Sequence, residues 1–331
     1  MSLFAADSTG AAELNRAGVQ YLQKGELAKA LEQFLAAAKL QPADPAIQFN
    51  AGLALFRLGR YREALAPLSA SLRHSATARE ARYMRGVVFF QLGQFEACAR
   101  ELETVRTGER FSEHVLYMLA ESYRNNHDEK RSREAFVELG NRYPDSPFLN
   151  KLMGTAYDWQ GDNAKAIQEF QQALRKNPRM PEIAFAIGYS FFKQRKYDDA
   201  RPWFQRELDL DPCYSKAHYY LGQMDLAQGR ADEAGARYRK ALECEPQYGD
   251  AYLGLGAVLE KQGEIDGAVK AYRQAARLKP NDQRAHYRLG TLLRRIGRHD
   301  ESKAEFAIAK KLIDEELRKT PQLAHPTEPQ P

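Results

Sequence analysis

Three cysteines and seven histidines are the residues whose chemistry could support catalysis or metal binding, and their spacing supports neither. Cys98, Cys213 and Cys244 are an odd number without a CxxC pair, so neither a zinc cluster nor a disulfide framework is predicted. The sequence shows no HExxH motif and no Walker loop, and "GLGAVL" from Gly254 lacks the third glycine of a dinucleotide-binding turn. We therefore expect no catalytic residue, no metal and no cofactor, and predict that the protein is not an enzyme.

Composition and charge are those of a foldable chain without a marked preference for nucleic acid or membrane. Of 331 residues, 44% are hydrophobic and 28% charged. The net charge of +5 comes from interleaved residues, so no nucleic-acid partner is expected. Apolar runs such as "VVFFQL" from Val87 fall far below the roughly 20 residues that span a bilayer, so no membrane span is predicted.

The N-terminal sequence "MSLFAADSTG" leaves the compartment open. It has no basic region and hardly any apolar core, so it is not an intact secretory signal and the sequence as given favours the cytoplasm. If a signal peptide has been trimmed, the periplasm or the outside of the cell is the alternative.

The elements that would position any functional side chain follow a 34-residue period without insertion or deletion. The eighth position is glycine in eight of nine units and Ala120 in the other, and the twentieth is always small. Glycine inside a helix costs about 1 kcal/mol relative to alanine, so its recurrence indicates that two helices pack closely there. Thus Gly222 should let its helix lie against the helix that carries Ala234. The units begin at Ala11, Pro45, Arg79, Glu113, Pro147, Pro181, Ser215, Gly249 and Gln283.

Other residues mark the ends of the helices within each unit. A glycine seven residues after the eighth position suits a tight turn between paired helices, with His127 and Arg195 as the two exceptions. Pro45, Pro147 and Pro181 are each expected to begin a first helix. Cys213 and Cys244 fall in neighbouring units and could approach each other, but the demanding geometry of a disulfide favours free thiols.

The segment "LNRAGVQYLQKGELAKALEQFLAAAKLQP", residues 14–42, resembles the tetratricopeptide repeat, and unit five repeats its signature from Met153 to Pro178. The resemblance implies an all-α fold: an α solenoid, or right-handed superhelix, of antiparallel helix pairs, with the first helix of each pair lining a concave groove. Nine tandem units would occupy residues 11–316, after a short segment at 1–10. Residues 317–331 would hold the end of a capping helix and a disordered proline-rich tail.

Six positions of each first helix, the second, fifth, sixth, ninth, twelfth and thirteenth, face away from its partner helix. In units two to seven these positions are rich in aromatic side chains, which could anchor a peptide segment or a helix of a partner protein. The same rings could instead pack between adjacent repeats. The predicted peptide-binding groove comprises Phe49, Asn50, Phe56, Tyr83, Phe90, Tyr117, Phe148, Phe185, Tyr189, Phe192, Tyr219 and Tyr220.

Basic side chains in unit nine offer a second candidate site. Family members that grip a C-terminal carboxylate use five lysine, asparagine and arginine residues over three units, and only Asn50 matches that set. Arg284, Arg288 and Arg295 with Tyr287 resemble part of such a clamp and could form an anion-binding end of the groove. The alternative is a solvated basic face.

These features predict an interaction scaffold that binds a protein or peptide of unknown identity in its groove. The alternative is an assembly subunit or adaptor that contacts partners through the solenoid ends or the convex face. A monomer is favoured. His218 and His286 share the fourth position of their units and are interpreted as packing residues rather than ligands or bases.

Overall fold

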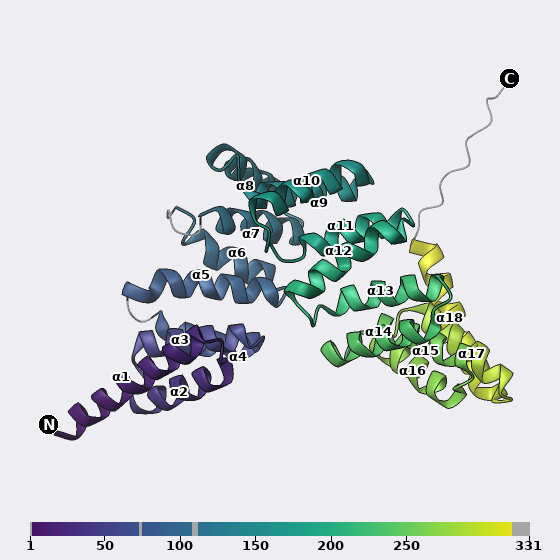
Figure 1. The fold of residues 1–331 in the computed structure, drawn as a ribbon, viewed down its shortest axis with the longest axis horizontal. Helices are drawn as coiled ribbons and strands as arrows, with labels where there is room; N and C mark the ends of the chain where they lie inside the picture. The colour runs from purple at the N-terminus through teal and green to yellow at the C-terminus, as the bar shows by residue number, and fades with distance from the viewer. Residues whose placement is uncertain (1, 73–74, 108–111, 320–331) are drawn as a thin grey trace. The chain divides into compact units, whose positions relative to one another are not determined.

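The computed structural model describes residues 2–72, 75–107 and 112–319, and this part of the chain contains eighteen α-helices and no strand (Figure 1). The expected all-α class is confirmed, and eighteen helices fit about nine pairs. The helices are α1 (Ser2–Gln23), α2 (Leu27–Leu40), α3 (Pro45–Arg57), α4 (Tyr61–Ser71), α5 (Ser75–Gln91), α6 (Phe95–Glu103), α7 (Ser112–Asn125), α8 (Glu129–Arg142), α9 (Pro147–Trp159), α10 (Asn163–Lys176), α11 (Ile183–Lys193), α12 (Tyr197–Leu210), α13 (Ser215–Ala227), α14 (Ala231–Cys244), α15 (Gly249–Gln262), α16 (Ile265–Leu278), α17 (Gln283–Arg295) and α18 (His299–Lys319).

The chain forms two compact units, Met1–Met153 and Gly154–Pro331, whose boundary falls inside α9. In the first unit, α1 packs against α2, α3 against α4, α5 against α6 and α7 against α8. In the second unit, α11 packs against α12, α13 against α14, α15 against α16 and α17 against α18. Within each unit the second helix of one pair also contacts the first helix of the next, so a core runs through the stacked pairs.

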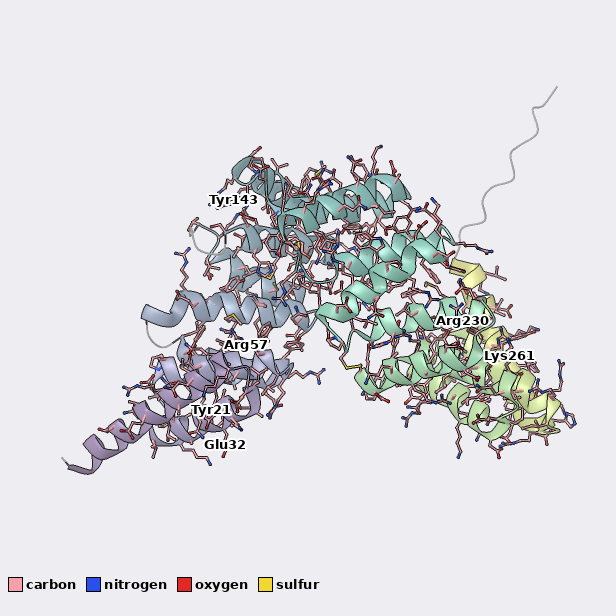
Figure 2. The ribbon with its side chains drawn as sticks, viewed as in Figure 1. Tyr21, Glu32, Arg57, Tyr143, Arg230 and Lys261 are labelled. Atoms are coloured by element: carbon pink, nitrogen blue, oxygen red, sulfur yellow. A yellow bond between two sulfur atoms is a disulfide. The ribbon has the colours of Figure 1, made fainter. Side chains whose placement is uncertain are left out.

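Tight turns join the two helices of a pair. The turn glycines, such as Gly229, have φ between 68° and 81°, and the two exceptions, His127 and Arg195, share this left-handed conformation with φ 59°. The prediction that these glycines form the tight turns is therefore confirmed, and the two exceptions adopt the same backbone conformation. Arg57 and Lys261 lie in the last turns of α3 and α15, just before such turns (Figure 2).

The close packing at the eighth position is confirmed, but the side chain that requires it is not the small one we expected. A Cβ added at Gly222 would lie 2.9 Å from the ring of Tyr238, one turn beyond Ala234. The same geometry recurs through the chain, and at Gly18 the added atom would lie 2.5 Å from Phe34. Glycine therefore makes room for the large residue at the twenty-fourth position of the facing helix.

The N-terminus of α11 departs from the expected start at Pro181. The helix begins at Ile183, because Glu182 adopts a left-handed conformation with φ 67°. The carboxylate of Glu207, on α12, accepts hydrogen bonds from the backbone N–H groups of Glu182 (2.8 Å) and Phe185 (3.1 Å). This carboxylate is buried, and it satisfies donors that a helix start leaves without partners.

The prediction of free thiols at Cys213 and Cys244 is wrong. These residues form a disulfide with a Cα–Cα distance of 5.3 Å, which links the turn before α13 to the last residue of α14. Cys98 is the remaining cysteine; it is buried, and burial raises the pKa of its thiol to about 11. The spacing placed the two cysteines in neighbouring units, but the distance between them depends on how the helix pairs stack, which the sequence alone does not give.

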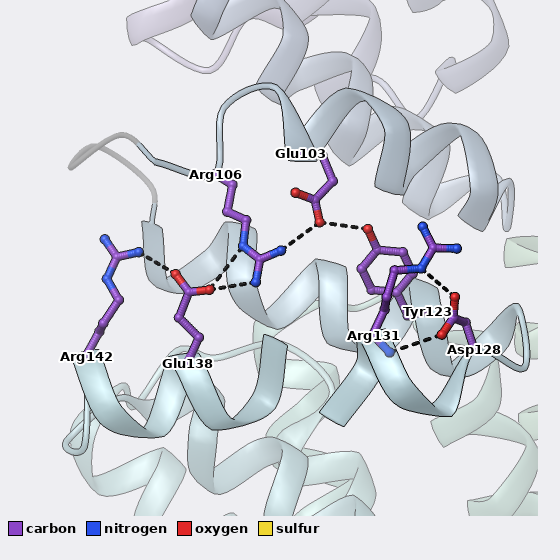
Figure 3. A network of polar contacts seen from close by, with 7 residues as sticks. All are labelled: Glu103, Arg106, Tyr123, Asp128, Arg131, Glu138 and Arg142. Atoms are coloured by element: carbon purple, nitrogen blue, oxygen red, sulfur yellow. Dashed lines mark hydrogen bonds and ion pairs between the residues drawn. The ribbon is translucent and has the colours of Figure 1, made fainter. Parts of the chain in front are cut away.

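A polar network in the first unit joins α6, α7 and α8 (Figure 3). Arg106 donates to Glu103 (2.9 Å) and to Glu138 (2.6 Å), and Glu103 also accepts from the hydroxyl of Tyr123 (2.7 Å). Arg142 donates to the second carboxylate oxygen of Glu138 (2.7 Å). Burial opposes ionisation of Glu138, but the hydrogen bonds from Arg106 and Arg142 outweigh it and lower its pKa. The network ties the segment after α6 to the following pair of helices.

Candidate functional site

The candidate site is the face of the first helices defined by the second, fifth, sixth, ninth, twelfth and thirteenth positions of each 34-residue unit. We call it the first-helix wall and describe it separately in the two compact units. In the described chain, no predicted groove aromatic is fully exposed; each is half-buried except Tyr117, which is buried. The rings therefore expose edges and hydroxyl groups more than whole faces.

In the first unit, rings from α5, α7 and α9 form one cluster. Tyr117 stacks on Phe148 with 5.2 Å between ring centroids, and Phe90 lies 6.3 Å from Tyr117. His114 joins them, 5.0 Å from Phe148 and 5.9 Å from Tyr83. We call these five residues the first cluster. Four of them are predicted groove residues, and they come together from three helices. Ring pairs at these distances stabilise one another and fix the rings in place.

His114 was missed by the sequence analysis although it occupies a wall position, the second of its unit. Its Nδ1 lies 2.6 Å from the hydroxyl of Tyr83, so these two groups share a hydrogen bond. Burial, aided by the positive charge of Lys151, lowers the pKa of His114 to about 4. The imidazole is therefore neutral at physiological pH and adds no charge to the wall.

In the second unit, the second cluster comprises Phe185, Tyr189 and Phe192 on α11 with Tyr219 and Tyr220 on α13. Tyr220 is its centre: its ring lies 4.9 Å from Phe192, 5.2 Å from Tyr189 and 5.7 Å from Phe185. Tyr219 meets Tyr220 edge-on at 5.1 Å. All five are predicted groove residues, so the structure unites them across two neighbouring pairs.

Two tyrosines from turns extend the second cluster. Tyr214 precedes α13 and lies 5.2 Å from Phe185, while Tyr248 precedes α15 and lies 5.2 Å from Tyr219. Burial is the main cause that raises the pKa of Tyr219 to about 12, and it raises those of Tyr214 and Tyr248 as well. These phenols are neutral at physiological pH.

The remaining predicted groove residues lie nearer the start of the first unit. Phe49 and Phe56 are half-buried and pack against its core, and Phe56 also contacts Tyr61 at 5.5 Å within the same helix pair. The side-chain amide of Asn50 donates to the amide oxygen of Asn15 at 2.9 Å. Asn50 is thus bonded to the neighbouring first helix, and a ligand would have to share or displace that hydrogen bond.

Carboxylates already neutralise much of the predicted anion-binding end. Arg284 pairs with Asp282 (2.6 Å) and Asp250 (2.8 Å), and Arg295 pairs with Glu260 (3.0 Å). Tyr287 is 54% exposed and contacts Phe306, and Arg288 is exposed with no ion pair among the described residues. The anion site stays a prediction, and it depends mainly on Arg288.

His218 and His286 have local hydrogen-bond partners consistent with packing roles. Nε2 of His218 lies 3.0 Å from the carbonyl oxygen of Pro212, and Nε2 of His286 lies 3.3 Å from that of Pro280. Nδ1 of His286 lies 2.7 Å from Glu305. Each histidine thus contacts the proline that follows the second helix of the preceding unit, Pro212 after α12 or Pro280 after α16.

A second wall residue that the sequence analysis passed over is Trp159, which is 70% exposed at the end of α9. The preceding Asp158 accepts hydrogen bonds from Lys193 (2.5 Å) and Ser190 (3.1 Å) of α11, and the Lys193 ammonium lies 5.2 Å from the Tyr189 ring centre. Trp159 occupies the thirteenth position of its unit. A systematic listing of the residues at all six wall positions in every unit would have included Trp159.

Some kinds of site are not found in the described parts of the chain. Over these residues, no group of three or more histidine, cysteine, aspartate or glutamate side chains could hold a metal ion. Among the described helices, none combines the length and apolar character needed to cross a bilayer.

Family comparison gives repeated matches along the chain. One tetratricopeptide repeat family model matches residues 49–105 and 152–214, and a second tetratricopeptide repeat model matches residues 114–146. The TPR repeat family matches residues 18–59, 222–263 and 261–297. These matches cover both compact units.

A curated relative is also a repeat protein of this kind. A TPR repeat-containing protein of Methanocaldococcus jannaschii is 24% identical over 160 residues, which are 48% of this chain and 28% of that protein. The chain therefore matches less than a third of the length of this curated relative.

Two solved structures share the fold at 18% identity. A tetratricopeptide repeat protein from Parabacteroides merdae has a TM-score of 0.57, with 76% of this chain and 99% of that chain covered. Human IFIT1, solved as a dimer with PPP-AAAA, has a TM-score of 0.58, with 89% and 81% covered. At this identity the likeness shows the fold alone.

Proposed function

Because the chain belongs to the tetratricopeptide repeat family, we propose that it is a non-enzymatic scaffold that binds a segment of a partner protein along its first-helix wall. The family's fold implies a protein–protein interaction scaffold in general. The choice of the wall as the binding surface, and of a peptide segment or helix as the ligand, is the specific part of the proposal.

The observation that carries this proposal is the convergence of aromatic side chains from neighbouring first helices. The second cluster holds five rings on α11 and α13 within 6.1 Å of a neighbouring ring, and each ring is half-buried. Rings that are already fixed lose little conformational freedom when a ligand covers their exposed edges. The tyrosine hydroxyls can also form hydrogen bonds with a peptide backbone.

Trp159 strengthens the proposal in the second unit. Its large apolar side chain is 70% exposed at a wall position, and tryptophan is among the residues that contribute most to binding when a partner covers them. Burial of this ring by a ligand would remove an energetically costly exposed surface.

A second candidate function, assembly through the outer face, has a specific observation in its favour. Leu35 on α2 and Val137 on α8 are 46% and 49% exposed, and they occupy the same position of their units on second helices. A partner that covered this face would bury both.

Assembly through the end of the last pair finds less support. Lys303 and Lys310 on α18 are exposed at positions where the preceding pair has the buried Val269 and Ala276 on α16. Another helix packed in the same manner would have to bury two ammonium groups. The last pair therefore has the polar outer face expected of a capping repeat.

Tryptophan fluorescence tests the wall directly, because Trp159 and Trp203 are the two tryptophans of the chain. A Trp203→Phe variant would leave Trp159 as the sole reporter. A dodecapeptide would be selected from a random library on the full chain and titrated into this variant. We expect a shift of the Trp159 emission on binding.

The matched variants are Trp159→Ala on the wall and Val137→Ala on the outer face. Because Trp159→Ala removes the reporter, the variants would be compared by the anisotropy of a fluorescently labelled peptide. We expect the wall substitution to weaken peptide binding by about tenfold or more and the other to leave it unchanged. Failure to select any peptide, or weakening only by Val137→Ala, would contradict the proposed binding surface.

A further inference from the structure

The net positive charge of the chain is concentrated on the first-helix wall. The chain has 49 basic and 44 acidic residues. Eleven of the basic residues and six of the acidic residues stand at wall positions, so 38 of each are found elsewhere. The rest of the protein is therefore balanced, and the wall carries an excess of five positive charges.

The acidic residues of the wall are already engaged. Asp158 accepts from Lys193, Asp250 pairs with Lys279 (2.7 Å) and Arg284, and Glu260 pairs with Arg295. The other three, Glu80, Glu121 and Glu182, also have interactions within the protein. Little negative charge on the wall is left without a partner.

Several basic side chains of the wall, in contrast to its acidic ones, have no ionic partner in the described part of the chain. In the described residues, six of them are exposed and form no ion pair: Arg16 and Arg57 in the first unit, and Lys216, Lys261, Arg288 and Arg294 in the second. Figure 2 labels Arg57 and Lys261, which lie near the ends of α3 and α15. Each unit therefore presents uncompensated positive charge on its first helices, and Lys216 lies on α13, which also carries Tyr219 and Tyr220 of the second cluster.

We propose that the wall binds an acidic segment of a partner protein, in which aspartate or glutamate side chains alternate with apolar ones. This inference rests on the proposed function and specifies the chemistry of the ligand. The apolar side chains would cover Trp159 and the exposed edges of the second cluster, while the carboxylates would pair with Lys216, Lys261 and Arg288. Complementary charge of this kind selects partners and speeds association.

A nucleic acid is the other polyanion to consider, and the wall suits it less well. Sequence-tolerant binding of single strands uses open aromatic faces on which bases stack. Most wall rings instead pack against one another and are half-buried. In the second unit, the unpaired cations are also spread over three helices, α13, α15 and α17.

The test is selection from a random dodecapeptide library on the full chain and on two charge-reversed variants. The wall variant carries Lys216→Glu, Lys261→Glu and Arg288→Glu. The matched control reverses three exposed residues on second helices, which form no ion pair within the described chain: Arg239→Glu, Lys270→Glu and Lys310→Glu. Circular dichroism would verify that both variants keep the helical content of the wild type.

We expect the wild type and the control variant to enrich peptides with an excess of aspartate and glutamate beside aromatic or aliphatic residues. The wall variant should bind these peptides at least about tenfold more weakly and should favour lysine-rich ones. Affinity should also fall with added salt.

Different failures have different meanings. Enrichment of neutral or basic peptides on the wild type would overturn the acidic ligand and leave the proposed function standing. Absence of any enriched peptide would overturn both. Equal loss of acidic peptides in the control variant would place the charge effect elsewhere. Tight binding of a twenty-nucleotide oligouridine at physiological salt, lost in the wall variant, would assign the wall to nucleic acid instead.

Discussion

Substitution of Gly256 by alanine tests the packing that holds each helix pair together. The added Cβ would lie 2.6 Å from two ring carbons of Tyr272 on the facing helix α16. That ring is fully buried, and its hydroxyl donates to Glu260 at 2.9 Å, so it has little freedom to move. The matched variant is Gly290→Ala, where the nearest ring atom, on the half-buried Phe306, is 3.1 Å away.

The magnitudes follow from two opposing effects. Alanine in place of glycine favours a helix by about 1 kcal/mol, and overpacking a closed core costs about 1 to 3 kcal/mol. At Gly256 the overpacking should be near the upper end, so the free energy of unfolding should fall by about 1 to 2 kcal/mol. At Gly290 a small movement of Phe306 relieves the contact, so the change should stay within about 1 kcal/mol of zero.

Urea denaturation followed by circular dichroism measures both variants. Because stacked repeats can unfold in parts, hydrogen exchange of the α15 and α16 amides should accompany it. We expect faster exchange in that pair for Gly256→Ala. If Gly256→Ala were as stable as the wild type or more stable, the close approach of ring and glycine would not be what the fold requires.

Three other predictions concern the start of α11, the half-buried His114 and the Cys213–Cys244 disulfide. Glu207→Gln leaves one backbone N–H of the α11 start without an acceptor, so unfolding free energy should fall by about 1 to 3 kcal/mol in urea denaturation; an unchanged midpoint would exclude the capping role. The pKa of His114 is about 4 in the folded protein against 6.5 ordinarily, so protonation favours unfolding and stability should fall by up to about 3 kcal/mol between pH 6.5 and 4. His114→Phe should lack this part of the pH dependence, and an identical pH profile would contradict it. Reduction of Cys213–Cys244, which are 31 residues apart, should lower stability by roughly 3 to 4 kcal/mol, while three reactive thiols in the untreated, denatured protein would show that the disulfide is absent.

The helix pairs were predictable because each is encoded locally. The 34-residue period places glycine at seven of the nine turns, and His127 and Arg195 adopt the same left-handed conformation at the other two. Local residue types also predict which helix face carries Tyr189 or Tyr220. The existence of the two clusters follows from that periodicity and from the packing of neighbouring pairs.

Features that depend on distant residues were not predictable. The sequence predicted that α11 starts at Pro181, but the helix begins at Ile183. The reason is Glu207 on the next helix, whose carboxylate accepts hydrogen bonds from the backbone at the start of α11. The period alone does not show that Cys213 and Cys244 lie close enough to bond. Likewise, the sequence shows an arginine at position 284 but not the two carboxylates that neutralise it.

Photo-crosslinking tests the central claim, binding on the first-helix wall, most directly. Benzoylphenylalanine would replace either Trp159 on the wall or Val137 on an outer second helix, two side chains that are both well exposed. Each protein would be irradiated with the same library-selected peptide. The account predicts a peptide adduct from position 159 and none above background from position 137. Adducts from position 137 alone would contradict it.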